Sequence, residues 1–320
     1  MRSGAQTLML LASPINCLIL QALDEGPKPQ TELRRAAGSP AQTTLRAQLK
    51  KLCALGAIER KRRNRFPGAI EHELTGAGRD LLSVAGVLGQ WLQNAPEGPL
   101  LLASPEAKAA IKALVEGWST AILRVLAARP LTLTELDGII TSLNYPSLER
   151  RLTAMKLAGQ VEQVRGNGRG TPYRVTEWTR QGVGPLVAAA HWERQHLAKE
   201  TSPVTKLDVE GGFLLALPLL QLPSDISGGC RLAVDVANGQ KHSLAGVLAK
   251  VETGRVASCT TRLDGHPEAW TSGSATAWLA ALIECDTDGL EIGGDGRLAN
   301  FVLDALHESL FGLHAKPQPH

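Results

Sequence analysis

The sequence lacks the short motifs that mark common catalytic sites. It contains no Gly-x-Ser-x-Gly elbow, no His-Glu-x-x-His pair and no Walker phosphate loop. Its 5 cysteines are scattered and include no Cys-x-x-Cys pair, which argues against a disulfide framework and against a zinc site. No apolar run reaches the ~18 residues that a membrane span needs. We therefore expect a cytoplasmic protein that is not an enzyme, binds no metal or cofactor and has no membrane partner.

Charge is distributed unevenly along the 320 residues. Residues 1–100 carry 13 basic and 8 acidic side chains, a balance of +5, and residues 101–200 carry 13 and 9, a balance of +4. Residues 201–320 carry 8 and 14, a balance of −6. The first two-thirds of the chain therefore suit a polyanionic partner, and the last third does not.

The stretch from Thr43 to Arg79 is the most informative part of the chain. Leu45, Leu49 and Leu52 recur at the i, i+4 and i+7 spacing that places them on one buried helix face. The polar and basic residues between them fall on the other faces. The pattern predicts a helix with one packed side and one side that faces solvent or phosphate.

A basic hairpin follows this helix. Gly56 supplies the left-handed position that commonly ends a helix, and a strongly basic tip, Arg60 to Arg65, precedes a returning strand that ends at Thr75. A basic run alone is also typical of a solvated loop. Because a helix fits the major groove and a basic hairpin reaches the backbone or minor groove beside it, the two in this order favour a wing after a reading helix.

The pattern occurs twice in the chain. Sliding the sequence by 103 residues superimposes Thr31-Glu32-Leu33 on Thr134-Glu135-Leu136 and Gly56 on Gly159, and the apolar positions of the two helices also coincide. After the wing the offset becomes 101. We expect helices, a hairpin and a long helix at 13–24, 30–37, 42–55, 57–75 and 76–94, and again at 105–128, 132–142, 146–158, 160–176 and 179–199. Thr31 and Thr134 stand where helix-opening residues are favoured.

The order of these motifs resembles the winged-helix regulators of the HxlR kind. The resemblance implies double-stranded DNA as partner, contacted by the reading helix and wing of each copy. The residues it assigns to DNA are Gln42, Thr43, Thr44, Arg46, Lys50, Arg60, Lys61, Arg62, Arg63 and Arg65 in the first copy, and Tyr145, Ser147, Arg150, Arg151, Arg165 and Arg169 in the second. The copies differ in charge, since Glu149 lies among the second set, so unequal contact with DNA is expected.

A different pattern begins after residue 200. Arg231 to Val236 alternates with period two, Asn238-Gly239 is a turn signal, and further strands are expected at 247–251 and 255–261. Ser274 can cap a helix from Ala275, and a second helix is expected over 297–310. These elements predict a small antiparallel sheet covered by helices.

This last segment resembles the sterol-carrier-protein-like fold. The resemblance implies an apolar tunnel between sheet and helices that holds a hydrophobic small molecule. Size and position single out Phe213, Trp278, Phe301 and Phe311 as candidate ligand-binding residues. The alternative is that these rings fill a solid core.

The sequence therefore predicts an α+β protein with two winged helix-turn-helix domains in tandem, 1–96 and 97–200, followed by a small sheet-plus-helix domain, 201–320. The expected function is that of a DNA-binding transcriptional regulator whose C-terminal domain senses a hydrophobic molecule. A carrier or sequestering protein, with the winged helices used for protein interaction, is the alternative. The duplication predicts either a monomer with pseudo-twofold symmetry or a homodimer.

Overall fold

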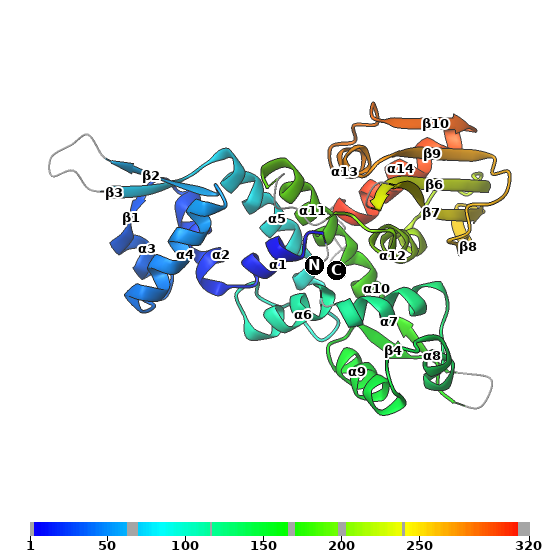
Figure 1. The fold of residues 1–320 in the computed structure, drawn as a ribbon, viewed down its shortest axis with the longest axis horizontal. Helices are drawn as coiled ribbons and strands as arrows, with labels where there is room; N and C mark the ends of the chain where they lie inside the picture. Colours follow the sequence, from blue (N-terminus) through cyan, green and yellow to red (C-terminus); the bar gives the residue numbers. More distant parts are fainter. Residues whose placement is uncertain are drawn as a thin grey trace, which may run out of the picture. The chain divides into compact units, whose positions relative to one another are not determined.

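The fold is known from a computed structural model that describes residues 3–62, 70–115, 117–165, 170–197, 203–238 and 241–312 (Figure 1). The chain divides into two compact units. The first unit contains residues 3–115 and 185–202, and the second contains residues 116–184 and 203–320. These two units are defined by contacts between residues and not by the sequence repeat. The three domains expected from the repeat therefore remain a prediction.

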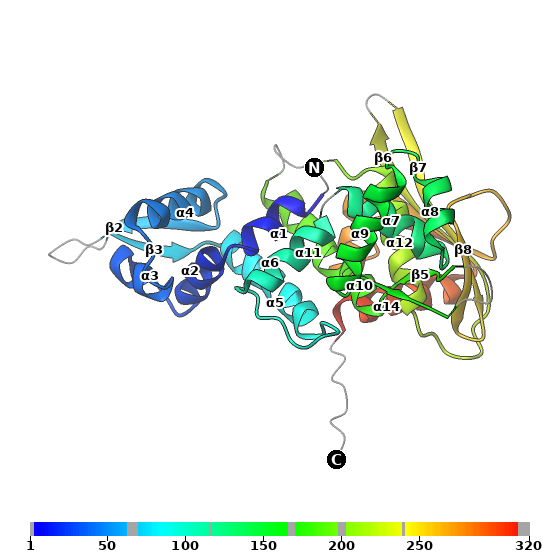
Figure 2. The ribbon, with the colours of Figure 1, turned by 90° about the horizontal axis from the view of Figure 1, so that it is seen from below.

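The first unit contains a helix-turn-helix and a three-stranded sheet, drawn in blue to cyan in Figures 1 and 2, and a layer of further helices whose colours run from blue to green. Its sheet has the order β1-β3-β2, and both pairs are antiparallel. The elements are α1 (Ala5–Leu11), α2 (Pro14–Asp24), β1 (Lys28–Pro29), α3 (Gln30–Ala36), α4 (Gln42–Ala54), β2 (Ile58–Arg62), β3 (Ile70–Leu74), α5 (Gly76–Gln93), α6 (Pro105–Val115) and the part of α11 (Val183–His196) from Pro185 onward.

The helical layer of the first unit joins segments that are far apart in the sequence. Helix α1 packs against α6. Trp192 of α11 is 2% exposed, and its indole N–H donates to the carbonyl oxygen of Ala77 in α5 at 2.8 Å. His196 lies 2.9 Å from the carboxylate of Asp80, also in α5. The part of α11 from Pro185 onward is therefore an integral part of the unit that holds α1.

The second unit begins with three helices, a two-stranded hairpin and a further helix, an order that matches α2 to α5 of the first unit except for the short strand β1. The elements are α7 (Gly117–Ala128), α8 (Leu133–Ile139), α9 (Tyr145–Leu157), β4 (Val161–Gln163), β5 (Tyr173–Val175) and α10 (Glu177–Gln181). Thr132 and Glu135 form a capping box at the start of α8, so the helix is opened by Thr132 and not by the predicted Thr134. The first copy's Thr31 is likewise inside α3, which follows Pro29.

The rest of the second unit is a five-stranded sheet with helices. The elements are α12 (Lys206–Ala216), the short 3₁₀ helix η1 (Leu217–Leu219), β6 (Gly228–Asn238), β7 (Lys241–Glu252), β8 (Arg255–Thr260), β9 (Ala269–Ser274), α13 (Ala275–Glu284), β10 (Leu290–Gly294) and α14 (Gly296–Phe311). Helix α13 contacts β6, β9 and β10, and α14 contacts the same three strands (Figure 1). Helix α12 packs against β7.

The prediction of a purely antiparallel sheet is wrong. The strand order is β10-β9-β6-β7-β8, and β9 pairs with β6 in parallel, with Leu232 opposite Thr271. The chain leaves β8 at one edge and crosses β7 and β6 before β9 begins, so β9 runs in the direction of β6. Periodicity predicts which face of a strand is buried, but it does not determine the strand order.

The two parts of the second unit are joined by helix packing and by hydrogen bonds of Arg180. Helix α12 packs against α7 and α10. The guanidinium of Arg180 in α10 donates to the carbonyl oxygens of Leu214 at 3.1 Å and of Ala127 at 3.4 Å, at the C-terminal ends of α12 and α7. Burial lowers the pKa of Arg180 from its ordinary value. Arg180 thus links the α7–α10 segment to the first helix of the sheet domain.

Among the described residues no single helix has both the length and the hydropathy of a membrane span. The pair Ala5–Leu11 and Pro14–Asp24 meets both criteria when taken together, with a bend of 80° between the two helices.

Candidate nucleic-acid interface

Helix α4 presents one apolar face and one polar face. Leu45, Leu49 and Leu52 are at most 4% exposed and fix the helix to its neighbours. The remaining faces are exposed and carry Gln42, Thr43, Thr44, Arg46, Lys50 and Lys51. In the structure all five residues predicted on this helix are exposed, and so is Lys51. Cations and hydrogen-bonding groups on one helix are what a major-groove reader needs.

The turn before α4 has a defined backbone. Gly38 and Ser39 both adopt positive φ, 79° and 55°. The Nε of Arg34 donates to the carbonyl oxygen of Pro40 at 3.0 Å and so ties α3 to the turn. This arrangement sets the angle at which α4 leaves α3.

Thr75 fixes the hairpin of β2 and β3, here called the wing, to the end of α4. Gly56 ends the helix at φ 70°. The Thr75 hydroxyl donates to the carbonyl oxygen of Ala57 at 3.1 Å and accepts from the N–H of Gly78 at 3.1 Å. One side chain therefore joins α4, the wing and α5, which holds the base of the wing in place.

The wing has two faces of different charge. Arg60 lies opposite His72 and Arg62 lies opposite Ile70, whereas Glu59 lies opposite Glu73 and Lys61 lies opposite Glu71. Since side chains alternate along a strand, Arg60 and Arg62 share one face, here called the arginine face. The other face, here called the acidic face, carries three carboxylates and one ammonium.

Lys61 is held by the acidic face. Its ammonium lies 3.1 Å from the Glu59 carboxylate and also donates to Glu73. The hydrogen bond with Glu73 raises the pKa of Lys61 and lowers the pKa of Glu73. Lys61 was predicted to contact DNA alongside its two neighbours, but the structure places it with carboxylates on the opposite side of the strand. Arg63 and Arg65, also predicted, lie outside the described residues.

Helix α9 carries the predicted residues of the second copy. Tyr145 is 43% exposed and Arg150 is exposed, while Ser147 and Arg151 are half-buried. The Asn144 side chain caps the helix by accepting from the N–H of Ser147 at 3.0 Å. Arg165 is exposed after β4, and Arg169 lies outside the described residues.

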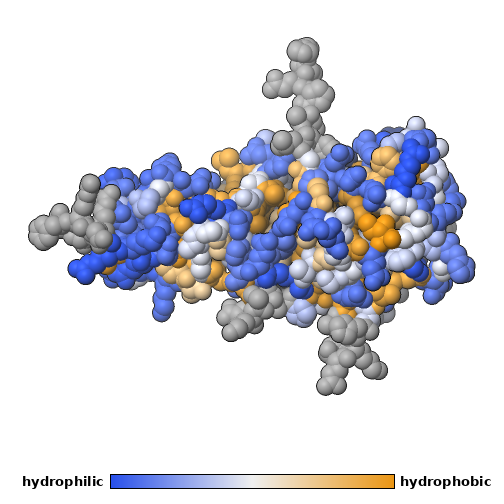
Figure 3. All heavy atoms as spheres, turned by 90° about the horizontal axis from the view of Figure 1, so that it is seen from above, coloured by the Kyte–Doolittle hydropathy of each residue, from blue (hydrophilic) through white to orange (hydrophobic). Residues whose placement is uncertain are grey.

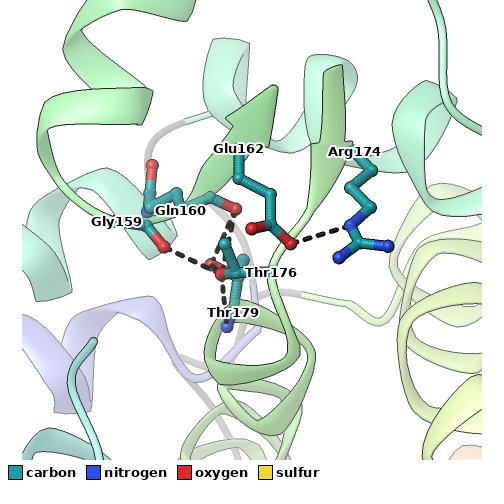
Figure 4. A network of polar contacts seen from close by, with 6 residues as sticks. All are labelled: Gly159, Gln160, Glu162, Arg174, Thr176 and Thr179. Carbon is teal, nitrogen blue, oxygen red and sulfur yellow. Dashed lines mark hydrogen bonds and ion pairs between the residues drawn. The ribbon is translucent and has the colours of Figure 1, made fainter. Parts of the chain in front are cut away.

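The second hairpin is tied to α10 as the first is tied to α5. The Thr176 hydroxyl donates to the carbonyl oxygen of Gly159 at 2.8 Å, and the Thr179 hydroxyl donates to that of Gln160 at 3.0 Å (Figure 4). Beside them Arg174 donates to Glu162 at 2.7 Å across the hairpin. Arg174 is the one cation in strands β4 and β5, and Glu162 on the paired strand neutralises its charge.

Two of the four predicted ligand-binding rings lie against each other. Phe213 and Trp278 are 7% and 3% exposed, with ring centroids 5.2 Å apart in an edge-to-face arrangement. The indole N–H of Trp278 donates to the carbonyl oxygen of Ala233 at 2.8 Å. Phe301 and Phe311 are half-buried on α14, where Phe301 lies under the guanidinium of Arg297 and Phe311 lies beside His307.

One polar residue of this domain was missed by the sequence analysis. Thr271 in β9 is fully buried, and its hydroxyl has no hydrogen-bond partner among the described residues. A buried hydroxyl without a partner costs about 1–3 kcal/mol. The alternation of the strand gave no signal, because threonine is a common strand residue. In the part of the chain that the structure describes, no three His, Cys, Asp or Glu side chains gather as a metal site would require.

The surface beside the wing, at the left of Figure 3, is mainly hydrophilic. The family described as HxlR-like helix-turn-helix matches residues 10–98, which span α2 to α5. Two relatives from Bacillus subtilis strain 168 are similar to part of the chain. The uncharacterized HTH-type transcriptional regulator YtcD is 35% identical over 88 residues, which cover 28% of this chain and 70% of the relative. The uncharacterized HTH-type transcriptional regulator YkvN is 33% identical over 94 residues, which cover 28% of this chain and 80% of the relative.

Proposed function

Because the chain belongs to the HxlR-like helix-turn-helix family of transcriptional regulators, we propose that it binds double-stranded DNA through α4 and the arginine face of the wing. The observation that carries this proposal is the separation of charge on the first unit. Arg46, Lys50 and Lys51 are exposed opposite the buried leucines of α4, and Arg60 and Arg62 share one face of the wing. Exposed cations on two adjoining elements suit a phosphate backbone.

The two elements have different tasks in this proposal. The N-terminal side chains of α4, Gln42, Thr43 and Thr44, are hydrogen-bonding groups of the kind that read base edges in the major groove. Arg60 and Arg62 contact phosphates and add affinity without sequence information. Lys61 is paired with Glu59 and Glu73 and makes no contact with DNA in this proposal.

The proposal includes a second winged helix in the same chain, formed by α7 to α10. Hydrogen bonds at matching positions support it. Thr75 N–H donates to Ala57 O at 3.2 Å, and Thr176 N–H donates to Gln160 O at 3.1 Å. Gly56 and Gly159, 103 positions apart, end their helices at φ 70° and 68°.

A chain with both copies can act as a monomer, because it already supplies two modules that other regulators obtain by association. Light scattering of the free protein at micromolar concentration tests this. A single chain mass supports the monomer, and a stable dimer contradicts it.

We further infer that the sheet domain binds a mainly apolar small molecule and that its occupancy changes DNA affinity. The buried hydroxyl of Thr271 supports a ligand with one hydrogen-bonding group, and Arg180 supplies a connection from α12 to α10. A ligand shifts DNA binding only by its differential affinity, which is typically about 1–3 kcal/mol, or roughly 5–150-fold. The role is not enzymatic.

A DNA titration at two salt concentrations tests the main proposal. A regulator that contacts several phosphates loses affinity steeply as salt rises, since each contact contributes about 0.9 to the slope of log K against log salt. The alternative, a carrier whose winged helices bind only protein, predicts weak binding with almost no salt dependence.

A further inference from the structure

The two reading helices share their buried face but not their exposed face. Leu45, Leu49 and Leu52 of α4 correspond to Leu148, Leu152 and Met155 of α9, and all six are at most 4% exposed. The three exposed cations of α4 have no cationic counterpart at the same positions of α9. Arg46 corresponds to Glu149, Lys50 to Thr153 and Lys51 to Ala154, and all six side chains are exposed.

The two hairpins differ in the same direction. Arg60, on the arginine face of the wing, corresponds to the uncharged Gln163, and Lys61 corresponds to Val164. Gln163 accepts from Lys156 of α9 at 2.7 Å, so this cation is engaged within the segment. Of the three described cations of β2, one has a basic counterpart, since Arg62 corresponds to Arg165.

The base-reading positions differ as well. The amide and hydroxyl side chains of Gln42 and Thr43 correspond to Tyr145 and Pro146, and the side chain of proline forms no hydrogen bond. Thr44 corresponds to Ser147, which is half-buried, whereas Thr44 is exposed. Helix α9 therefore retains cations, such as Arg150, that suit phosphates, but it has fewer exposed groups that suit base edges.

We propose that this chain recognises a non-palindromic site on double-stranded DNA, in which α4 reads the bases and α9 contributes only backbone contacts. The inference rests on the proposed function. In a homodimer every substitution appears in both halves, so the DNA site mirrors the twofold symmetry of the protein. Two copies within one chain can diverge independently, and the absence of a cation at Glu149, Thr153, Ala154 and Gln163 is the difference between the copies on which the proposal rests.

Selection from a library of random duplexes with the full chain, followed by sequencing, tests the proposal. The expected result is one conserved block of bases flanked by positions of low information. Two equally conserved blocks in inverted repeat would overturn the proposal. If the chain does not bind DNA as proposed above, the result is different from both. In that case no duplex is enriched, and the binding to any duplex does not depend on salt.

A matched pair of variants gives a second readout. Arg46→Ala is expected to weaken binding to the selected duplex about 10-fold or more and to reduce its preference over scrambled duplexes. Arg150→Ala is expected to weaken binding to selected and scrambled duplexes by the same factor and to lower the salt slope by about 0.9. Both arginines are exposed, so folding should be unchanged, which circular dichroism checks. An Arg150→Ala variant that changes sequence preference as much as Arg46→Ala would contradict the assignment.

Discussion

The carboxylate of Glu193 accepts hydrogen bonds from the backbone N–H and from the hydroxyl of Thr7, both at 3.0 Å. It also accepts from the N–H of Gly4 at 2.8 Å. Glu193 is 3% exposed and belongs to α11, whereas Gly4 and Thr7 begin α1. A negative charge at a helix N-terminus satisfies free N–H groups and is favoured by the helix dipole. Glu193 thus anchors the first helix of the chain to a late one.

Replacing Glu193 tests the anchor. Glu193→Ala leaves two buried N–H donors and a hydroxyl without an acceptor, so we expect the free energy of unfolding to fall by about 2–3 kcal/mol. Urea unfolding measures this as a lower midpoint. Glu97→Ala removes an exposed carboxylate of the same unit and should change stability by less than about 0.5 kcal/mol. Equal midpoints for the two variants would contradict the role given to Glu193.

The two faces of the wing predict different salt dependence. Arg60→Gln with Arg62→Gln removes both cations of the arginine face, so the slope of log K against log salt should fall by about 1.8. Lys61→Gln removes one cation from the acidic face and should leave the slope unchanged. Fluorescence anisotropy titrations between low and moderate salt provide the measurement. A slope that falls by about 0.9 in the Lys61 variant would show that this lysine contacts phosphate.

His72 predicts a pH dependence of stability. Burial first, and then the charge of Arg60, lower the pKa of His72 from its ordinary value of 6.5. The unfolded chain therefore takes up the proton at higher pH than the folded chain. The stability that depends on neutral His72 is present above pH 6.5 and is lost as the pH falls through the lower folded pKa.

The variant His72→Gln isolates this contribution. Its melting temperature should fall less than that of the unsubstituted protein between pH 7 and pH 5, because one group with a lowered pKa is gone. If the melting temperatures of the two proteins fell by the same amount between pH 7 and pH 5, His72 would be ruled out as a source of acid sensitivity.

Trp278 predicts a graded series in the sheet domain. Trp278→Phe keeps much of the ring volume but leaves the carbonyl oxygen of Ala233 without its donor, at a cost of about 1–3 kcal/mol. Trp278→Ala adds a cavity beside Phe213 and should cost about 3–5 kcal/mol. Trp270→Phe, on a half-buried tryptophan of β9, is the control and should cost less than either. If Trp278→Ala left the melting temperature unchanged, Trp278 would not be a core residue.

The helices α2 to α5 of the first unit could be predicted from the sequence to within a residue or two, whereas the single helices expected at 105–128 and 179–199 are each found as two helices, α6 with α7 and α10 with α11. The expected helices 42–55 and 76–94 are found as Gln42–Ala54 and Gly76–Gln93. Apolar spacing and the Gly56 stop are local signals, and the tertiary packing agrees with them. Sequence also indicated which face of α4 is exposed.

The missed features depend on partners that are distant in the sequence. In the sequence Lys61 is one more cation in a basic run. Its hydrogen bond with Glu73, which lies 12 positions later, follows from the strand register and could not be predicted from the run. The parallel pairing of β6 with β9 follows from a crossover that periodicity does not encode. Helix α1 was not predicted, because its acceptor, Glu193, lies near the other end of the first unit.

The position of Glu193 has a consequence for synthesis of the protein. The N–H of Gly4 and its acceptor are 189 positions apart. At a synthesis rate of about 5–20 residues per second, roughly 10–40 s pass between the emergence of α1 and that of its cap. During that interval α3, α4 and the wing can form from local contacts. The N-terminal N–H groups of α1 have no acceptor from Glu193 until α11 has been synthesised. A chain cut at residue 98 would keep α4 and the wing and would leave Gly4 and Thr7 without their acceptor, so α1 lacks this cap until translation has passed residue 193.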